Sequence, residues 1–196
     1  MYRYFYKTKL NTMESSYLSS AIKQFEYYKS LGDKTINKLS FEELKKEFAT
    51  DSNSIAIIVK HLVGNMQSRW LNFLTEDGEK KWRKRDEEFI DDFNSKDELL
   101  AAWQQGWECL FKAIKPLTKN NLEQIIYIRN QGHSVTEAIN RQMMHYAYHI
   151  GQIVFIGKLI KGKNWQSLSI AKGQSKTYNK SKFKEDKSRK HFTDDI

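Results

Sequence analysis

The chain has 196 residues, of which 39% are apolar and 13% aromatic, so it is long enough for one domain with a hydrophobic core but short for two. Its single cysteine, Cys109, excludes an intramolecular disulfide, and one proline with nine glycines favours long helices over many short strands. The net charge of +9 is unevenly placed, because the last 26 residues hold eight Lys/Arg and four Asp/Glu while the rest of the chain is only mildly basic.

The start of the chain, MYRYFYKTKLNTMESSYL, lacks the apolar stretch and the small-residue cleavage site of a signal peptide. The longest apolar stretch, around Ile150–Ile160, is too short and too interrupted to span a bilayer. We therefore expect a soluble, cytoplasmic protein without a membrane partner.

Apolar and aromatic residues at helical spacing predict a first long helix, which begins after Ser15 or Ser16. Gly32 is expected to end this helix as its C′ residue. A short helix follows, in which Ser40 and Glu43 have the spacing of a capping box.

The second long helix is expected to start near Ser52 or Asn53 and to stop at the polar sequence TEDG. Its apolar face consists of Ile55, Ile58, Val59, Leu62, Met66, Trp70, Phe73 and Leu74. The stretch that follows, EKKWRKRDEEFIDDFNS, is dense in charges of both signs, and we expect it to be an ordered connection that faces solvent.

A third long helix is expected to begin at Ser95, with a second capping-box spacing, and to end before Pro116. The sequence QIIYIR then has the β-branched and aromatic character of a short strand, with an extended linker as the alternative. Ser134 and Glu137 make a third capping box, which opens a last long helix that ends at Gly162. Four long helices with connections of varied length predict an all-α fold, a four-helix bundle.

His145 and His149 lie four residues apart in the apolar sequence RQMMHYAYHIGQIVFIGKLIKG, so their rings share one face of the last helix. Burying two imidazoles costs free energy unless each finds a partner. A metal ion could satisfy both, and hydrogen bonds to backbone or carboxylate groups are the alternative. The motif H-E-x-x-H is missing, which argues against a zinc protease with a glutamate base. His133, before a helix cap, and His191, in the tail, are not expected to join such a site.

His61 lies in the middle of the second long helix, on a polar stripe that runs from Ser54 to Asn72 beside the apolar face. Such a stripe either faces solvent or lines an internal cavity. Gly64, next to Asn65, would allow a neighbouring helix or a ligand to approach closely. A third histidine in this setting favours a metal site that joins the two helices.

Two stretches, KHLVGNMQSRWLNFLTEDGEKKWRKRDEEF and HSVTEAINRQMMHYAYHIGQIVFIGKLIKGKNWQSLSI, resemble the DinB-like superfamily of metal-binding four-helix bundles, and most closely a bacterial branch of it. The resemblance covers Met13–Asn179 and includes H-x-x-x-H followed by IGQI. It implies a divalent metal ion, zinc or nickel, on His61, His145 and His149. It also implies a homodimer, although nothing in the sequence locates the interface. Relatives include S-transferases that use bacillithiol, mycothiol or glutathione, and proteins described as metal-dependent hydrolases.

Three imidazoles would leave a coordination position open, as in catalytic metal sites. The ion could activate water, which gives hydrolysis, or bind a thiolate, which gives transfer of a low-molecular-weight thiol. Asn65 and Gln152 are candidates to orient the substrate, with hydrogen bonds between helices as the alternative. Arg69 and Arg141 are candidates to bind an anionic group, with surface solvation as the alternative. The polar stripe carries no obvious carboxylate base, and Glu108 on the third long helix is the one candidate.

We expect three segments: an N-terminal extension over residues 1–12, because relatives start near Met13, the bundle over residues 13–170, and a basic, flexible tail over residues 171–196. Acidic residues interrupt each basic cluster of the tail and no recognition motif accompanies it, so nucleic-acid binding is not expected. The expected function is a metal-dependent enzyme with a small-molecule substrate, either a thiol S-transferase or a hydrolase. The alternative is a non-enzymatic bundle that binds a metal ion or a protein partner.

Overall fold

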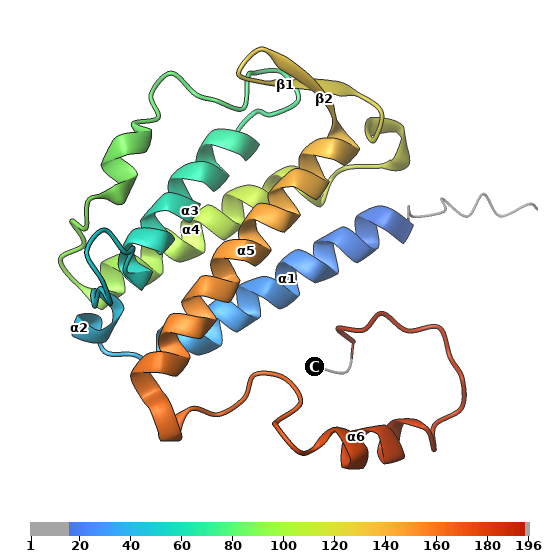
Figure 1. The fold of residues 1–196 in the computed structure, drawn as a ribbon. Helices are drawn as coiled ribbons and strands as arrows, with labels where there is room; N and C mark the ends of the chain where they lie inside the picture. The colour runs from blue at the N-terminus through green and yellow to red at the C-terminus, as the bar shows by residue number, and fades with distance from the viewer. Residues whose placement is uncertain (1–15, 195–196) are drawn as a thin grey trace, which may run out of the picture.

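The structure of the protein is a computed structural model that describes residues 16–194, and this part of the chain is mostly helical, as the sequence predicted (Figure 1). The long helices are α1 (Ser16–Asn37), α3 (Ile55–Trp70), α4 (Lys96–Ile114) and α5 (Val135–Lys161). The shorter helical elements are α2 (Phe41–Leu44), the 3-10 turns η1 (Arg85–Phe89), η2 (Lys119–Asn121) and η3 (Gly162–Asn164), and α6 (Ser175–Lys182). An antiparallel hairpin precedes α5 and consists of β1 (Ile125–Ile128) and β2 (Gln131–Ser134).

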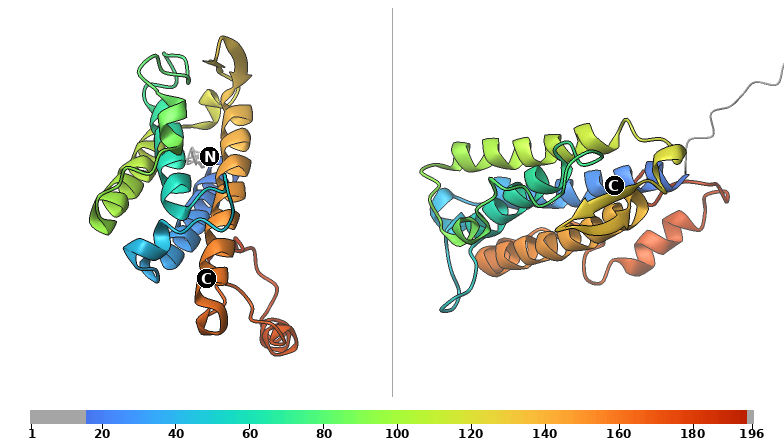
Figure 2. Two further views of the ribbon diagram at one scale, coloured as in Figure 1. Left: turned by 60° about the vertical axis from the view of Figure 1, so that its left-hand side comes forward. Right: turned by 90° about the horizontal axis from the view of Figure 1, so that it is seen from above.

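The long helices lie side by side, with α1 against α5 and α3 against α4, and α3 also meets α5 (Figure 2). Helices α1 and α5 run in one direction, and α3 and α4 run in the other (Figure 1). Because α3 and α4 are consecutive and parallel, the chain between them has to return along the outside of α3. This return segment, residues 71–95, places η1 against α3.

Large rings fill the core between these helices. Phe25 of α1, Trp103 and Trp107 of α4, and Tyr146 of α5 are almost completely buried. Ring centroids lie 5.5 Å apart for Trp103 and Trp107, and 5.9 Å apart for Trp107 and Tyr146. Because each such ring buries roughly 150–250 Å², a few of them give the helices a shared apolar centre even though only 39% of the chain is apolar.

Local capping sets the helix starts. Two of the three expected capping boxes are complete, those of Ser40 with Glu43 and of Ser134 with Glu137. Ser95 caps α4 with its hydroxyl, but the Glu98 carboxylate bonds to the backbone of Asn94 instead of closing the box. Helix α3 is capped by Ser54, one to two residues later than the sequence predicted. Each cap satisfies backbone N–H groups that the first turn leaves without a partner.

Gly32 does not end α1, so the prediction of a C′ glycine was wrong. The helix continues to Asn37, and Gly32 is buried inside it. A Cβ atom at this position would lie only 2.6 Å from Cζ2 of Trp103. A glycine that ends a helix and a glycine that admits a neighbouring ring look the same in sequence, and here the second role applies.

Gly32→Ala is therefore expected to lower the free energy of unfolding by about 1–3 kcal/mol, because the added methyl group overlaps a packed ring. Urea unfolding followed by circular dichroism measures this loss. In the double variant Gly32→Ala with Trp103→Phe, the smaller ring leaves room for the methyl group, so the loss should be less than the sum of the two single losses. A Gly32→Ala protein as stable as the wild type would contradict the close contact.

The segments before and after α5 both contain regular secondary structure. The sequence QIIYIR forms β1, so the strand interpretation was right and the linker alternative was not.

After η3 the chain forms α6, which the sequence did not predict, and then returns to α1 (Figure 1). There the His191 Nε2 atom is 3.0 Å from Ser20 Oγ, and Lys23 Nζ is 2.5 Å from a carboxylate oxygen of Asp194. The flexibility of this tail stays a prediction.

The N-terminal extension predicted over residues 1–12 lies outside the described residues. Within residues 16–194, none of the helices combines the length and the apolar character that crossing a membrane requires.

Candidate metal centre

Three histidines from two helices come together where α3 faces α5. His61 of α3 is 6% exposed, and His145 and His149 of α5 are partly buried. One nitrogen from each ring lies within 4.8 Å of the other two. The Nε2 atoms of His61 and His145 are 3.3 Å apart, and the ring centroid of His149 is 5.0 Å from that of His61 and 4.8 Å from that of His145. The structure therefore brings together the three residues that the sequence singled out.

The surroundings keep two of these rings neutral. Burial, followed by the electrostatic influence of the neighbouring His149, His61, Arg69 and Arg83, lowers the pKa of His145 to about 3. Burial likewise lowers the pKa of His149. A neutral imidazole keeps a free lone pair, which is the form that binds a metal ion.

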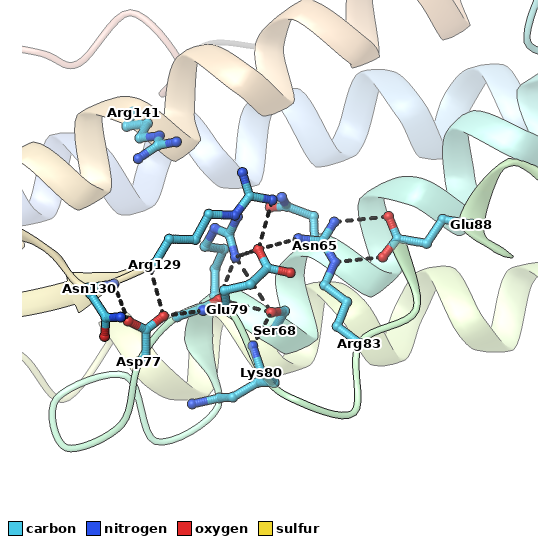
Figure 3. Close-up of polar contacts among 12 residues, drawn as sticks. Asn65, Ser68, Asp77, Glu79, Lys80, Arg83, Glu88, Arg129, Asn130 and Arg141 are labelled. Carbon is cyan, nitrogen blue, oxygen red and sulfur yellow. Dashed lines mark hydrogen bonds and ion pairs between the residues drawn. The ribbon is translucent and has the colours of Figure 1, made fainter. Parts of the chain in front are cut away.

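Glu88 of η1 fixes the ring of His61. Its Oε2 atom is 2.9 Å from His61 Nδ1. Arg83 binds both carboxylate oxygens at 2.7 and 2.9 Å (Figure 3). Burial alone would raise the pKa of Glu88, but the hydrogen bonds from His61 and Arg83 outweigh burial, so the pKa lies below its usual value. An ionised carboxylate only accepts hydrogen bonds, so His61 must donate through Nδ1–H. Its Nε2 lone pair then faces His145.

Gly64, one turn after His61, makes room for this carboxylate. A Cβ atom at Gly64 would lie 2.3 Å from Oε1 of Glu88. On the next residue of η1, the Phe89 ring stacks on His61 at a centroid distance of 5.3 Å. A group does approach Gly64 closely, as predicted, but it is a carboxylate of the return segment and not a neighbouring long helix or a ligand.

Gln152 orients the second histidine of α5. Its Oε1 atom is 2.7 Å from His149 Nδ1. Because an amide oxygen accepts hydrogen bonds, His149 donates through Nδ1–H and keeps its lone pair on Nε2. Two of the three rings are therefore held through Nδ1, with Nε2 left for another ligand.

The donor set fits a divalent transition-metal ion. Imidazole nitrogen suits zinc, nickel, copper and iron. Two nitrogens held at about 2.0–2.1 Å from one tetrahedral ion are about 3.3 Å apart. The Nε2 atoms of His61 and His145 have this separation of 3.3 Å. Together with His149, these residues could hold a metal ion.

Asn65 and Arg141, two other candidates from the sequence, have partners away from the histidines. The Asn65 Oδ1 atom accepts a hydrogen bond from the Tyr146 hydroxyl at 3.1 Å, and that hydroxyl accepts one from Trp70 Nε1 at 3.0 Å. This is hydrogen bonding between helices, the alternative considered for Asn65. Arg141 is exposed, 3.1 Å from His133 Nε2, and stands apart from the polar network in Figure 3.

Arg69, the remaining candidate, is buried and binds the return segment. Its Nη1 atom contacts the carbonyl oxygen of Gly78 and lies 3.0 Å from Oε2 of Glu79. The same oxygen is 3.3 Å from Arg83 and 3.2 Å from Arg129. Arg69 thus helps to hold the return segment in place, and its role in binding an anionic substrate stays a prediction.

Most of the charged stretch 79–95 is exposed, as the sequence predicted, but the prediction was wrong for three of its charged residues. Glu88 is 6% exposed and Lys80 is 7% exposed, and only 2% of the Arg83 side chain is exposed. Runs of mixed charge are usually solvated, and no spacing in this run marks the carboxylate that points inward. Glu108, the candidate base, is exposed and accepts a hydrogen bond from Gln104 on the surface of α4.

A family model described as "Protein of unknown function (DUF1572)" matches residues 12–174 of the chain. No curated protein and no solved structure matches it. The matched residues include every element from α1 to η3, and with them the three histidines and their partners.

Proposed function

This chain belongs to the DUF1572 family, and we propose that it is a metal-dependent enzyme with a divalent ion, zinc or nickel, on His61, His145 and His149. The observation that carries the proposal is the convergence of three imidazoles, two of them oriented by Glu88 and Gln152. The resemblance described above supports placing the chain in the DinB-like superfamily. The proposed fold is the four-helix bundle of that superfamily, over residues 13–170.

Each group at the site has a defined task in this proposal. A bound ion would supply Lewis acidity and an open coordination position toward a thiol or a water molecule. Glu88 and Gln152 hold two imidazoles in the orientation that leaves Nε2 free. Arg83 compensates the buried charge of Glu88 and keeps it a pure acceptor.

Thiol transfer suits the site better than hydrolysis. Within residues 16–194, the carboxylate that contacts the histidines is Glu88, and His61 and Arg83 engage both of its oxygens. Glu88 is therefore not free to remove a proton from water as a general base. A thiol ionises far more readily than water, with a pKa of about 8.5, so its activation does not need that base. We propose a low-molecular-weight thiol, of the bacillithiol type, as co-substrate.

A hydrolase remains within the proposal as the second reaction class, because the same open position would serve water. The alternative from a different class is a non-enzymatic protein that uses the ion for structure or for binding a partner. A cytoplasmic homodimer completes the proposal and is supported by the resemblance.

Metal analysis tests the site directly. Full-length protein loaded with zinc or nickel and freed of excess metal is expected to retain about one ion per chain. His145→Ala should retain far less, because only two imidazoles remain. His133→Ala, which removes a partly buried ring outside the cluster of three histidines, should retain the wild-type content. Mass spectrometry of the metal, with circular dichroism to show that each variant is folded, gives the result. Equal metal content in His145→Ala and the wild type would contradict the three-histidine site.

Turnover assays then test the reaction class. Metal-loaded protein is incubated with an electrophile and, in turn, bacillithiol, mycothiol and glutathione. A thioether product with at least one thiol, lost when the metal is removed, is expected. Ester or amide cleavage without consumption of thiol would favour the hydrolase, and bound metal with neither activity would favour the non-enzymatic alternative.

A further inference from the structure

The outward side of α5 carries an apolar stripe that is exposed in the described part of the protein. Its large members are Met144 (75% exposed), Tyr148 (63%), Phe155 (61%) and Leu159 (48%). With Gly151 between them, the spacing of three and four residues puts these positions on one side of the helix. The sixteen positions 142–157 hold no Asp, Glu, Lys or Arg. Solvent-facing sides of helices normally carry charged residues, so this stripe has the composition of an interface.

We propose that two copies of this chain pair through the stripe, with their α5 helices antiparallel and a two-fold axis between positions 151 and 152. The order of side chains along the stripe is self-complementary. When the helix is turned end for end about that point, Met144 faces Leu159 of the partner subunit. In the same way, Tyr148 faces Phe155 of the partner subunit. A two-fold dimer requires such a surface, in which each residue meets its counterpart twice.

Gly151 at the proposed axis removes the obstacle to close approach. It is exposed, and a Cβ atom there would meet nothing within 4 Å. Two helices can therefore cross at this point without a side chain between their backbones. Ala147 and Val154, which border the stripe on one side, are small and apolar as well.

The area of the stripe is sufficient for a specific dimer. With roughly 200 Å² for each large side chain, the exposed fractions of its four members correspond to about 500 Å² per copy. A pair would then bury about 1,000 Å², which is where specific interfaces begin. Contacts along the edges of the stripe would add to this area. A second copy thus accounts for the size and the symmetry of the stripe and for the lack of charge over positions 142–157.

The stripe lies next to the histidines. The Tyr148 ring is 4.9 Å from the ring of His149, centroid to centroid. Pairing would therefore place the partner helix beside the candidate metal centre. This interface deepens the homodimer part of the proposed function and does not depend on a bound ion. A failure of the dimer would leave the metal content unchanged, and a failure of the metal site would leave the dimer unchanged.

Sedimentation velocity of the full chain is the test. The wild type is expected to sediment with twice the chain mass of 23.3 kDa. Tyr148→Lys alone and Phe155→Glu alone should each sediment with the mass of one chain at the same concentration. Each substitution is present in both copies, so it buries two unpaired charges in the apolar interface. Ile125→Glu, which adds a charge to an equally exposed residue of β1, is the matched control and should remain dimeric.

The double variant Tyr148→Lys with Phe155→Glu decides the orientation. In the antiparallel pair each new lysine faces a new glutamate of the partner, so the mass should return to that of the dimer. In a parallel pair like charges would face each other and the protein would stay monomeric. The proposal is overturned if the wild type is monomeric, if the single variants remain dimeric while folded by circular dichroism, or if the double variant stays monomeric.

Discussion

Glu88→Ala is expected to lower the free energy of unfolding by about 3–5 kcal/mol and to weaken metal binding by about 10- to 100-fold. The loss of stability follows from Arg83, whose side chain is 2% exposed and would keep its charge without the carboxylate that binds it twice. The loss of affinity follows from His61, because its Nδ1–H would lose the acceptor that fixes the ring and the tautomer. Urea unfolding of metal-free protein and titration against a competing chelator measure the two effects separately.

Two matched variants separate the roles of Glu88. Glu87→Ala removes the neighbouring carboxylate, which is exposed and paired with exposed Lys84, and should change stability by less than about 0.5 kcal/mol. The double variant Arg83→Met with Glu88→Leu removes both buried charges, so most of the stability should return. Its metal affinity should stay low, because no acceptor faces His61. Wild-type affinity in this double variant would show that Glu88 does not position the ring.

Gly64→Ala is expected to disturb the same site because the added methyl group overlaps Glu88. It should lower the free energy of unfolding by about 1–3 kcal/mol and weaken metal binding by about 10-fold or more. The new Cβ atom would fall 2.3 Å from Oε1 of Glu88. The carboxylate cannot simply withdraw, because Arg83 and His61 hold it in place. It has to tilt or shift, and the ring of His61 moves with it or loses its partner.

The control for Gly64→Ala is the same change at a glycine with open space. Gly151→Ala adds a methyl group that meets nothing within 4 Å. In solution dilute enough to keep the chain monomeric, it should raise helix stability by roughly 0.5–1 kcal/mol. Combining Gly64→Ala with Glu88→Asp, which shortens the side chain by one methylene, should recover part of the metal affinity. A Gly64→Ala protein with wild-type stability and affinity would refute the tight contact between Gly64 and Glu88.

The long helices could be predicted because their signals are local. The capping box of Ser134 and Glu137 begins α5, and Gly162 ends it, as the sequence indicated. Apolar periodicity depends on the geometry of the helix alone, so it is visible before any packing is known. The three turns and the short α6 were missed because their sequences carry no period that distinguishes them from loops.

The roles of Gly32 and Gly64 could not be told apart from local sequence patterns. Gly32 and Gly64 both lie inside helices and both admit a side chain from elsewhere in the chain. The sequence interpretation gave one of them a terminating role and the other a role in close approach. Only the neighbouring side chains, Trp103 for one and Glu88 for the other, decide between these roles.

The sequence by itself determined the helical class and the i,i+4 placement of His145 and His149 on one face, because backbone periodicity imposes both. The tertiary structure decided which carboxylate meets His61. Helices α3 and α4 run parallel, so the segment between them has to return along α3 and carries Glu88 to a residue 27 positions earlier. Whether a charged residue is solvated or buried depends on the partner that the fold brings to it, and no local pattern contains that information.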